Sequence, residues 1–296
     1  MNQALRVTLA KQKAEAFLRE EGIEALPVDP FAIASSRDIV VKPKPDAEAG
    51  VSGMLLRYGD VFGILYATHI QSEGFQRFSI AHELGHYFLD GHIDYVLPKG
   101  SQVHTSHAGF VSGDPYELEA DNFAAGLLMP DRPFKRALAK CEPGISTVES
   151  MANLCRTSLT ATAIRYAELT DDAVAVVVST GLTIDYCRLS ETMKSLRELT
   201  WLIRGSAVPM KTTTGRLNGF PDRVARADRA AEEIDIMDWL GGVRSVNALE
   251  EVVGLGSYGK TLTVLTCPSI QEQIDEEEDN DDEDSVIERW TPRFRK

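Results

Sequence analysis

The sequence predicts an α+β fold, and three observations carry that prediction. Apolar residues recur at helical spacing over residues 4–20, 73–89 and 116–129. Alternating or short continuous apolar segments, which are typical of strands, occupy separate blocks at residues 38–67 and from Ala173 onward. The length of 296 residues exceeds what one core usually requires, so we expect one large domain and a smaller one.

The first block begins with a helix over residues 4–20, and the two prolines of LPVDPF interrupt the pattern that follows it. Three strands are predicted next, in the segments DIVVKP, GVSGMLLR and VFGILYAT. The last two are joined by Tyr-Gly-Asp at residues 58–60, and a glycine between two alternating segments indicates a hairpin turn.

Two longer helices follow the hairpin. Ser72 is a suitable N-cap for a helix over residues 73–89, because its hydroxyl can accept from a free amide of the first turn. A loop is expected from His104 to Pro115. A second helix then covers residues 116–129, and Pro130 ends it.

The rest of the chain combines short helices and strands. Residues 145–170 contain two short helices in an arrangement similar to a helix-turn-helix. AVAVVVS and LTIDYCRL are expected to be strands joined near Gly181, and KTLTVLTC is a last strand. The stretch after Gln271 is acidic and of low complexity, and we expect it to be disordered.

The composition is ordinary for a globular protein, and the charge distribution gives no sign of nucleic-acid binding. Hydrophobic residues make up 43% of the chain and charged residues 26%, which is ordinary for a globular protein. Eleven acidic residues and no Lys or Arg lie between Glu272 and Glu288, so the formal charge of −14 falls to −3 without that stretch. No basic patch is concentrated enough to indicate nucleic-acid binding by charge alone.

The sequence shows no signal for export or membrane insertion. No apolar run approaches the roughly 18 residues that a membrane span needs. The charged N-terminal segment lacks the apolar core and cleavage site of a signal peptide. The four cysteines form no CxxC pair, so we expect free thiols. We therefore expect a cytoplasmic protein without a membrane partner.

The strongest motif is HExxH, written HELGH at residues 82–86. His82 and His86 are four apart, so on a helix both imidazoles face one side and can reach one tetrahedral Zn²⁺. Glu83 can reach a water at the metal and take its proton as a general base. The motif therefore predicts a zinc-dependent hydrolase.

A catalytic zinc site needs a third protein ligand, and two residues are candidates. Glu117, on the second helix, is favoured, while His92, six residues after His86, stays open. Asp121 lies one turn after Glu117 and can accept a hydrogen bond from a ligand histidine, which would fix its tautomer. Glu119 points to another face of that helix, so we expect it to be a surface charge.

Two further histidines are candidates for a role in the chemistry. His104 and His107 are three apart in the expected loop, and either one can stabilise the oxyanion that forms when water attacks a peptide carbonyl. A solvated position is the alternative for each. His92 and Asp121 are candidates to support the metal ligands rather than to bind the ion.

The two helices resemble those of the ImmA/IrrE family of metallopeptidases. QRFSIAHELGHYFLDGH and YELEADNFAAGLLMP carry the resemblance, and the pattern E-x-x-A-D-x-F-A-A-x-L-L-M-P from Glu117 is far more specific than HExxH. The upstream segments LPVDPFAIA and GVSGMLLR are also similar to that family. Many members have a histidine four residues after the second ligand histidine, where this chain has Asp90.

This resemblance implies a gluzincin-like site with Zn²⁺ held by His82, His86 and Glu117, and with Glu83 as the catalytic residue. It also implies a substrate, because similar bacterial proteins cut transcriptional repressors of the XRE helix-turn-helix type and thereby switch on stress or mobile-element genes. Two alternatives stay open: a toxin-like peptidase controlled by a partner protein, and a regulator that binds without cutting.

Four parts of the chain are predicted: a zinc metallopeptidase domain at 1–140, a helix-turn-helix-like linker at 141–171, an α/β sensor or substrate-recruiting domain at 172–271, and a disordered tail at 272–296. The third part is similar to the GAF-like domain of some relatives. Direct DNA binding is not expected, since the linker carries only Arg156 and Arg165 as positive charges.

Overall fold

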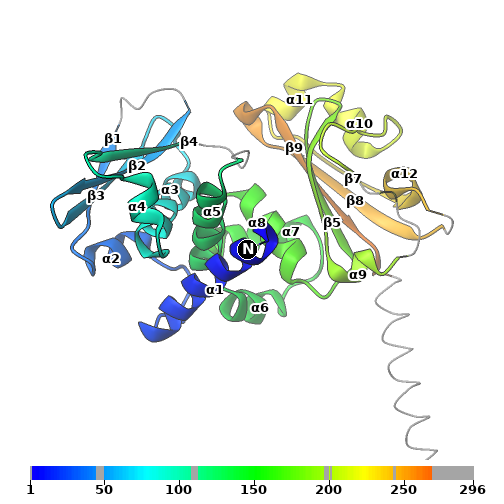
Figure 1. The fold of residues 1–296 in the computed structure, drawn as a ribbon. Coiled ribbons are helices and arrows are strands. Elements are labelled where there is room, and N and C mark those ends of the chain that lie inside the picture. The colour runs from blue at the N-terminus through cyan, green and yellow to red at the C-terminus, as the bar shows by residue number, and fades with distance from the viewer. Residues whose placement is uncertain are drawn as a thin grey trace, which may run out of the picture. The chain divides into compact units, whose positions relative to one another are not determined.

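The computed structural model describes residues 2–44, 50–107, 113–196, 200, 202–242 and 245–268. It confirms the mixed α+β class, with helices and two sheets in those ranges (Figure 1). The chain divides into two compact units, which are Met1–Cys141 with Val148–Arg165, and Glu142–Thr147 with Tyr166–Lys296. The domain limits expected from the sequence stay predictions, and the acidic tail lies outside the described residues.

The N-terminal unit contains a four-stranded sheet in the order β1-β3-β2-β4. Its strands are β1 (Val40–Lys44), β2 (Val51–Tyr58), β3 (Val61–Ala67) and β4 (Val103–His107). The predicted hairpin is confirmed, because β2 and β3 pair antiparallel and Tyr58 faces Val61 across the turn. β1 runs parallel to β3, and β4 pairs antiparallel with β2 at the edge of the sheet.

β4 corrects the loop expected from His104 to Pro115. Its sequence, VHTSH, has one apolar residue and no apolar alternation, so the hydrophobic pattern gave no strand signal. Pairing with β2, which includes the partners Leu55 and His104, imposes the extended conformation instead.

The first helices of the N-terminal unit are α1 (Gln3–Glu20), α2 (Pro30–Ser35), α3 (Glu73–Phe88), α4 (His92–Val96), α5 (Pro115–Leu128) and α6 (Asp131–Leu138). The expected cap of α3 is present, since the Ser72 hydroxyl accepts from the amide of Phe75. α5 begins with an Asp114 cap and Pro115 in its first turn. Both long helices predicted from the sequence are therefore confirmed.

Helix α3 packs against β2, β3 and α5, and α1 packs against the other side of α5 (Figure 1). Two glycines permit these close approaches. A Cβ at Gly85 would lie 3.0 Å from the Cα of Ala120, and one at Gly126 would lie 3.0 Å from the carbonyl oxygen of Lys11. The backbones of α1, α3 and α5 are thus held at short range, which fixes the residues that α3 and α5 present to each other.

The two short helices expected over residues 145–170 are α7 (Ile145–Cys155) and α8 (Leu159–Leu169). Both arginines of this segment form ion pairs inside the N-terminal unit. Arg156 contacts Glu73 at 2.7 Å, and the buried Arg165 donates to the carbonyl of Met129 and pairs with Asp131.

The C-terminal unit is built on a five-stranded antiparallel sheet in the order β6-β5-β9-β8-β7. The strands are β5 (Val174–Thr180), β6 (Thr183–Leu189), β7 (Arg229–Asp235), β8 (Asn247–Gly254) and β9 (Lys260–Thr266). β5, β6 and β9 confirm the sequence prediction. β7 and β8 were not expected. The sequence of β7, RAAEEID, is largely polar and its side chains are mostly exposed, while the two glutamates of β8 interrupt its apolar pattern.

Short helices complete the C-terminal unit: α9 (Glu191–Lys194), α10 (Thr213–Asn218), α11 (Pro221–Ala225), α12 (Met237–Leu240) and the 3₁₀ turn η1 (Gly256–Tyr258). The buried carboxylate of Glu250 on β8 accepts from the backbone amides of Thr213 and Thr214, so it satisfies the first turn of α10. The GAF-like arrangement stays a prediction.

Two expectations about the whole chain can be compared with the structure. All four cysteines are free thiols, as predicted. Within the ranges that the structure describes, no helix combines the length and the apolar character that a membrane crossing requires.

We expect Gly126→Val to destabilise the N-terminal unit by about 1–3 kcal/mol, because the added side chain would meet the backbone of α1. The measurement is the midpoint of thermal unfolding. Gly113→Val is the control, since a Cβ at this exposed position meets no atom within 4 Å. Equal midpoints for the two variants would contradict the close packing of α1 on α5.

Candidate metal centre

Helix α3 places two imidazoles side by side at its buried face. His82 and His86 are one turn apart, and their Nε2 atoms lie 3.1 Å from each other. Both rings are buried, with their planes at 77°. Each histidine therefore directs the same ring nitrogen to one point, as two ligands of one ion must.

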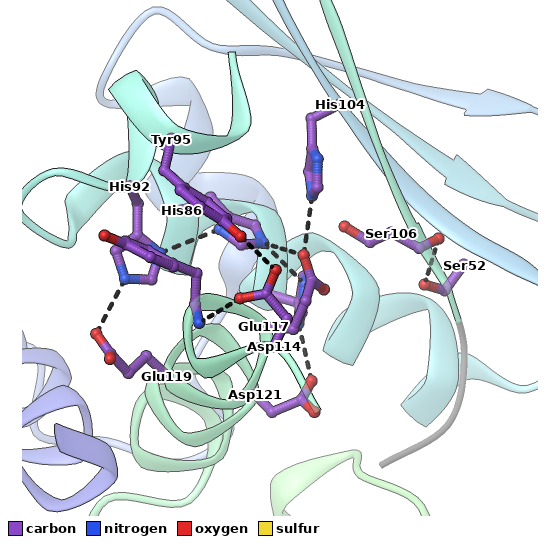
Figure 2. Close-up of polar contacts among 12 residues, drawn as sticks. Ser52, His86, His92, Tyr95, His104, Ser106, Asp114, Glu117, Glu119 and Asp121 are labelled. Atoms are coloured by element: carbon purple, nitrogen blue, oxygen red, sulfur yellow. Dashed lines mark hydrogen bonds and ion pairs between the residues drawn. The ribbon is translucent and has the colours of Figure 1, made fainter. Parts of the chain in front are cut away.

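Helix α5 brings a carboxylate to the same point (Figure 2). Glu117 Oε2 lies 3.2 Å from His82 Nε2, and Glu117 Oε1 lies 3.4 Å from His86 Nε2. Ligand atoms at about 2.0–2.1 Å from a tetrahedral ion are about 3.3 Å apart. The measured separations match that value, so His82, His86 and Glu117 form a group that can hold a metal ion.

The charges in this cluster favour a cation. Burial lowers the pKa of His86 to about 3, which keeps its imidazole neutral and able to act as a ligand. Burial alone would also lower the pKa of His82, but hydrogen bonds to Asp121 and Glu117 outweigh it and raise this pKa to about 10. Burial disfavours ionised Glu117, yet hydrogen bonds from His104, His82 and His86 hold its pKa far below the usual range.

Glu83 is the least satisfied polar residue of the site. It is fully buried, and neither carboxylate oxygen has a hydrogen-bond partner among the described residues. Burial raises the pKa of this carboxyl, although the nearby His82 opposes that effect. A buried carboxylate normally finds partners, so Glu83 is suited to a role that needs a free acceptor beside the ligand group.

A glycine makes room for that carboxylate. A Cβ at Gly53 on β2 would lie 2.5 Å from Glu83 Oε1. Ser106 on β4 is also buried near Glu83, with its hydroxyl unpartnered among the described residues. Gly53 was not expected from the sequence to belong to the site, although a glycine inside a strand often marks a close approach of this kind.

The two imidazoles have different hydrogen-bond partners at Nδ1, and Figure 2 shows the partner of His86, which is His92. His82 Nδ1 lies 2.8 Å from Asp121 Oδ1, in the place where the sequence expects such a contact. His86 Nδ1 lies 3.1 Å from His92 Nδ1, so His92 stands behind the ligand group instead of entering it. Asp90, four residues after His86, has a side chain that is 98% exposed.

The interpretation of Glu119 as a surface charge is wrong. Its side chain is only 13% exposed, and Oε2 lies 3.1 Å from His92 Nε2. Its other oxygen pairs with Arg6 on α1. The helical spacing correctly separates Glu119 from the face of Glu117 and Asp121, but α1 and α4 cover the face that was assumed to meet solvent.

The two candidate oxyanion residues fall in different places. His104 Nε2 lies 3.1 Å from Glu117 Oε1, and its side chain is 18% exposed. His107 is exposed, at the end of β4 opposite Val51. Residues three apart in a strand point to opposite faces, so β4 can present only one of the two histidines to the site.

Two imidazoles from one helix, a carboxylate from a second helix and a buried glutamate without a hydrogen-bond partner among the described residues are the arrangement of an HExxH metallopeptidase site. Residues 34–165 match the family model of Peptidase_M78, the IrrE N-terminal-like domain. This segment of the chain is therefore similar to the peptidase domain of that family. The matched range includes α3 and α5 but not α1.

A Mycobacterium tuberculosis transcriptional regulator of known structure is similar to this chain, with a TM-score of 0.55 and 14% sequence identity. The similarity covers 87% of this chain and 76% of that protein. At this identity the likeness concerns the fold. No curated protein matches the chain.

We expect the purified protein to bind about one Zn²⁺ per chain and His82→Ala to lose that binding, because two ligands hold the ion far less well than three. Isothermal titration of the metal-free protein measures both. His69→Ala is the matched control, since His69 is an exposed histidine away from the group. Equal zinc affinity in the wild type and His82→Ala would show that the ion binds elsewhere.

Proposed function

We propose that this protein is a zinc-dependent endopeptidase that cuts a specific intracellular protein. The observation that carries the proposal is the buried carboxylate of Glu83, which has no hydrogen-bond partner among the described residues and lies beside the converging atoms of His82, His86 and Glu117. The match of residues 34–165 to a peptidase family model supports it. Two imidazoles and one carboxylate are also the ligand set of a catalytic zinc site in which one position stays open.

Peptide hydrolysis needs an activated water and a group that transfers its proton, and the site can supply both. Bound Zn²⁺ would polarise the scissile carbonyl and lower the pKa of the attacking water. Glu83 accepts the proton from that water and passes it to the leaving amine. Its burial favours this role, because an acceptor without other partners keeps its oxygens available, and a raised pKa makes it a better base.

His104 is the best placed residue to stabilise the oxyanion. It lies on an edge strand, next to the ligand carboxylate of Glu117, and it is partly exposed, so a substrate can reach it. An imidazole N–H donates to an oxygen that becomes negative during attack. His107 is exposed at the far end of β4 and is not assigned this role.

The substrate that we propose is a transcriptional repressor of the XRE helix-turn-helix type, whose cleavage switches on stress or mobile-element genes in a bacterial cytoplasm. The sequence resemblance supports this choice. The structurally similar Mycobacterium tuberculosis protein is named a transcriptional regulator, which agrees with a role in gene control. We propose that the C-terminal unit, with its separate antiparallel sheet, is a GAF-like part that senses a signal or recruits the repressor.

We expect Glu83→Gln to reduce cleavage of an XRE-type repressor at least about 100-fold and to leave zinc binding unchanged, because the amide cannot take a proton. Electrophoresis of the repressor and metal analysis of the same samples test this. A repressor that is released from its operator equally well by wild type and Glu83→Gln, without being cut, would instead indicate a regulator that only binds.

We expect Gly53→Ala to slow the same cleavage about 100-fold while zinc affinity is kept, because the added Cβ displaces the Glu83 carboxylate by about 1 Å. Gly63→Ala on the neighbouring strand is the control, since its Cβ would meet no atom closer than 3.4 Å. Full activity of Gly53→Ala would show that the position of Glu83 in the structure is not the active one.

A further inference from the structure

The two candidate histidine ligands differ in the residue that contacts Nδ1 of each ring. His82 contacts a carboxylate, Asp121, directly. His86 reaches a carboxylate only through a second imidazole, because His92 Nδ1 lies 3.1 Å from His86 Nδ1 and His92 Nε2 lies 3.1 Å from Glu119 Oε2. These contacts form a pathway from His86 through His92 to Glu119. Its two imidazole rings are fully buried, so solvent cannot replace either contact.

The protons of this pathway have one consistent arrangement when a metal is bound. His86 offers Nε2 to the ion, so its Nδ1 carries the hydrogen and donates to Nδ1 of His92. Nε2 of His92 then carries the other hydrogen and donates to the carboxylate of Glu119. The opposite assignment would place the hydrogen of His86 on Nε2, so this nitrogen could not bind the ion. It would also turn a lone pair of His92 Nε2 toward the carboxylate of Glu119, so no hydrogen bond could form between them.

Arg6 on α1 completes the pathway. Its Nε donates to Glu119 Oε1, while its guanidinium lies over the ring of Tyr116 with 5.0 Å to the centroid. Tyr116 in turn contacts the ring of His92 edge-on. The arginine therefore fixes the carboxylate that orients His92, and α1 is itself held on α5 at Gly126.

From these contacts we propose that Arg6, Glu119 and His92 are positioning residues that hold the metal ligand His86 in the tautomer and orientation needed for binding. Glu119 and His92 lie within the matched family segment, but α1 does not, so an element outside the peptidase family match contributes to the metal centre. The proposal rests on the metal site of the proposed function and deepens it.

The three residues should differ in how much they matter. Loss of His92 leaves the buried Nδ1–H of His86 without an acceptor, and loss of Glu119 leaves His92 without one. Partners behind a ligand typically change metal affinity about 10- to 100-fold. Arg6 is partly exposed, at 26%, and acts through Glu119, so its removal should weaken binding only about five-fold.

The test measures the dissociation constant for Zn²⁺ by competition with a chelator, in the full chain, for the wild type and for His92→Ala, Glu119→Ala and Arg6→Ala. Arg19→Ala is the matched control, because Arg19 is an exposed arginine on the same helix. The melting temperature of each metal-free variant shows whether the fold is kept. We expect His92→Ala and Glu119→Ala to weaken binding about 10- to 100-fold.

A double substitution separates the pathway from simple helix packing. Arg6→Ala should weaken zinc binding in the wild-type background and have no further effect when combined with Glu119→Ala, because its action passes through that carboxylate. Arg6→Lys, which keeps the charge, should restore part of the affinity. A loss that is equally large with and without Glu119 would overturn the pathway and assign the effect to α1 packing.

The remaining outcomes separate this inference from the proposed function. Wild-type zinc affinity in both His92→Ala and Glu119→Ala, together with lost binding in His82→Ala, would overturn the pathway and leave the metal site standing. Failure of the wild-type chain to bind Zn²⁺ would overturn both. Intact zinc binding with the expected losses, but no repressor cleavage, would support the pathway and count against the proposed substrate.

Discussion

The structure of the N-terminal unit depends on bringing two imidazole nitrogens and one carboxylate to a single buried point. In water such groups would be solvated separately, and their burial without a cation is costly. Here His82 and Glu117 meet only because α3 and α5 touch at Gly85 and Ala120, where a larger residue than glycine would hold the helices apart. The close packing of α3 on α5 is therefore also the condition for forming the ligand group.

The same constraint explains the residues around the ligands. Each imidazole that offers Nε2 to an ion must place a hydrogen on Nδ1, and a buried N–H needs an acceptor. Asp121 supplies one acceptor directly, and His92 supplies the other with Glu119 behind it. Glu83 is the exception, since its oxygens have no hydrogen-bond partner in the part of the chain that the structure describes, which suits a base but not a structural residue.

Much of the fold was predictable from local patterns. The hairpin, α3 with its Ser72 cap, α5 and the strands β5, β6 and β9 all carry strong periodicity or turn signals. β4, β7 and β8 were missed. The sequences of β4 and β7 are largely polar, so pairing with a neighbouring strand rather than burial decides their conformation. β8 has two adjacent glutamates, which interrupt its apolar pattern. The strand conformation of β4 matters for the candidate site, because it points His104 and His107 to opposite faces of the sheet.

The sequence by itself determined that His82 and His86 face one point, because residues four apart on a helix lie on the same side. It left Glu117 and His92 as candidates for the third ligand, and the packing of α3 on α5 brought Glu117 to that point. The tertiary structure alone decided what stands behind and beside the ligand group. Gly53 faces Glu83 from another strand, and Arg6 reaches Glu119 across 113 positions of the chain. No local period encodes such contacts, since they arise only when separate elements pack against one another.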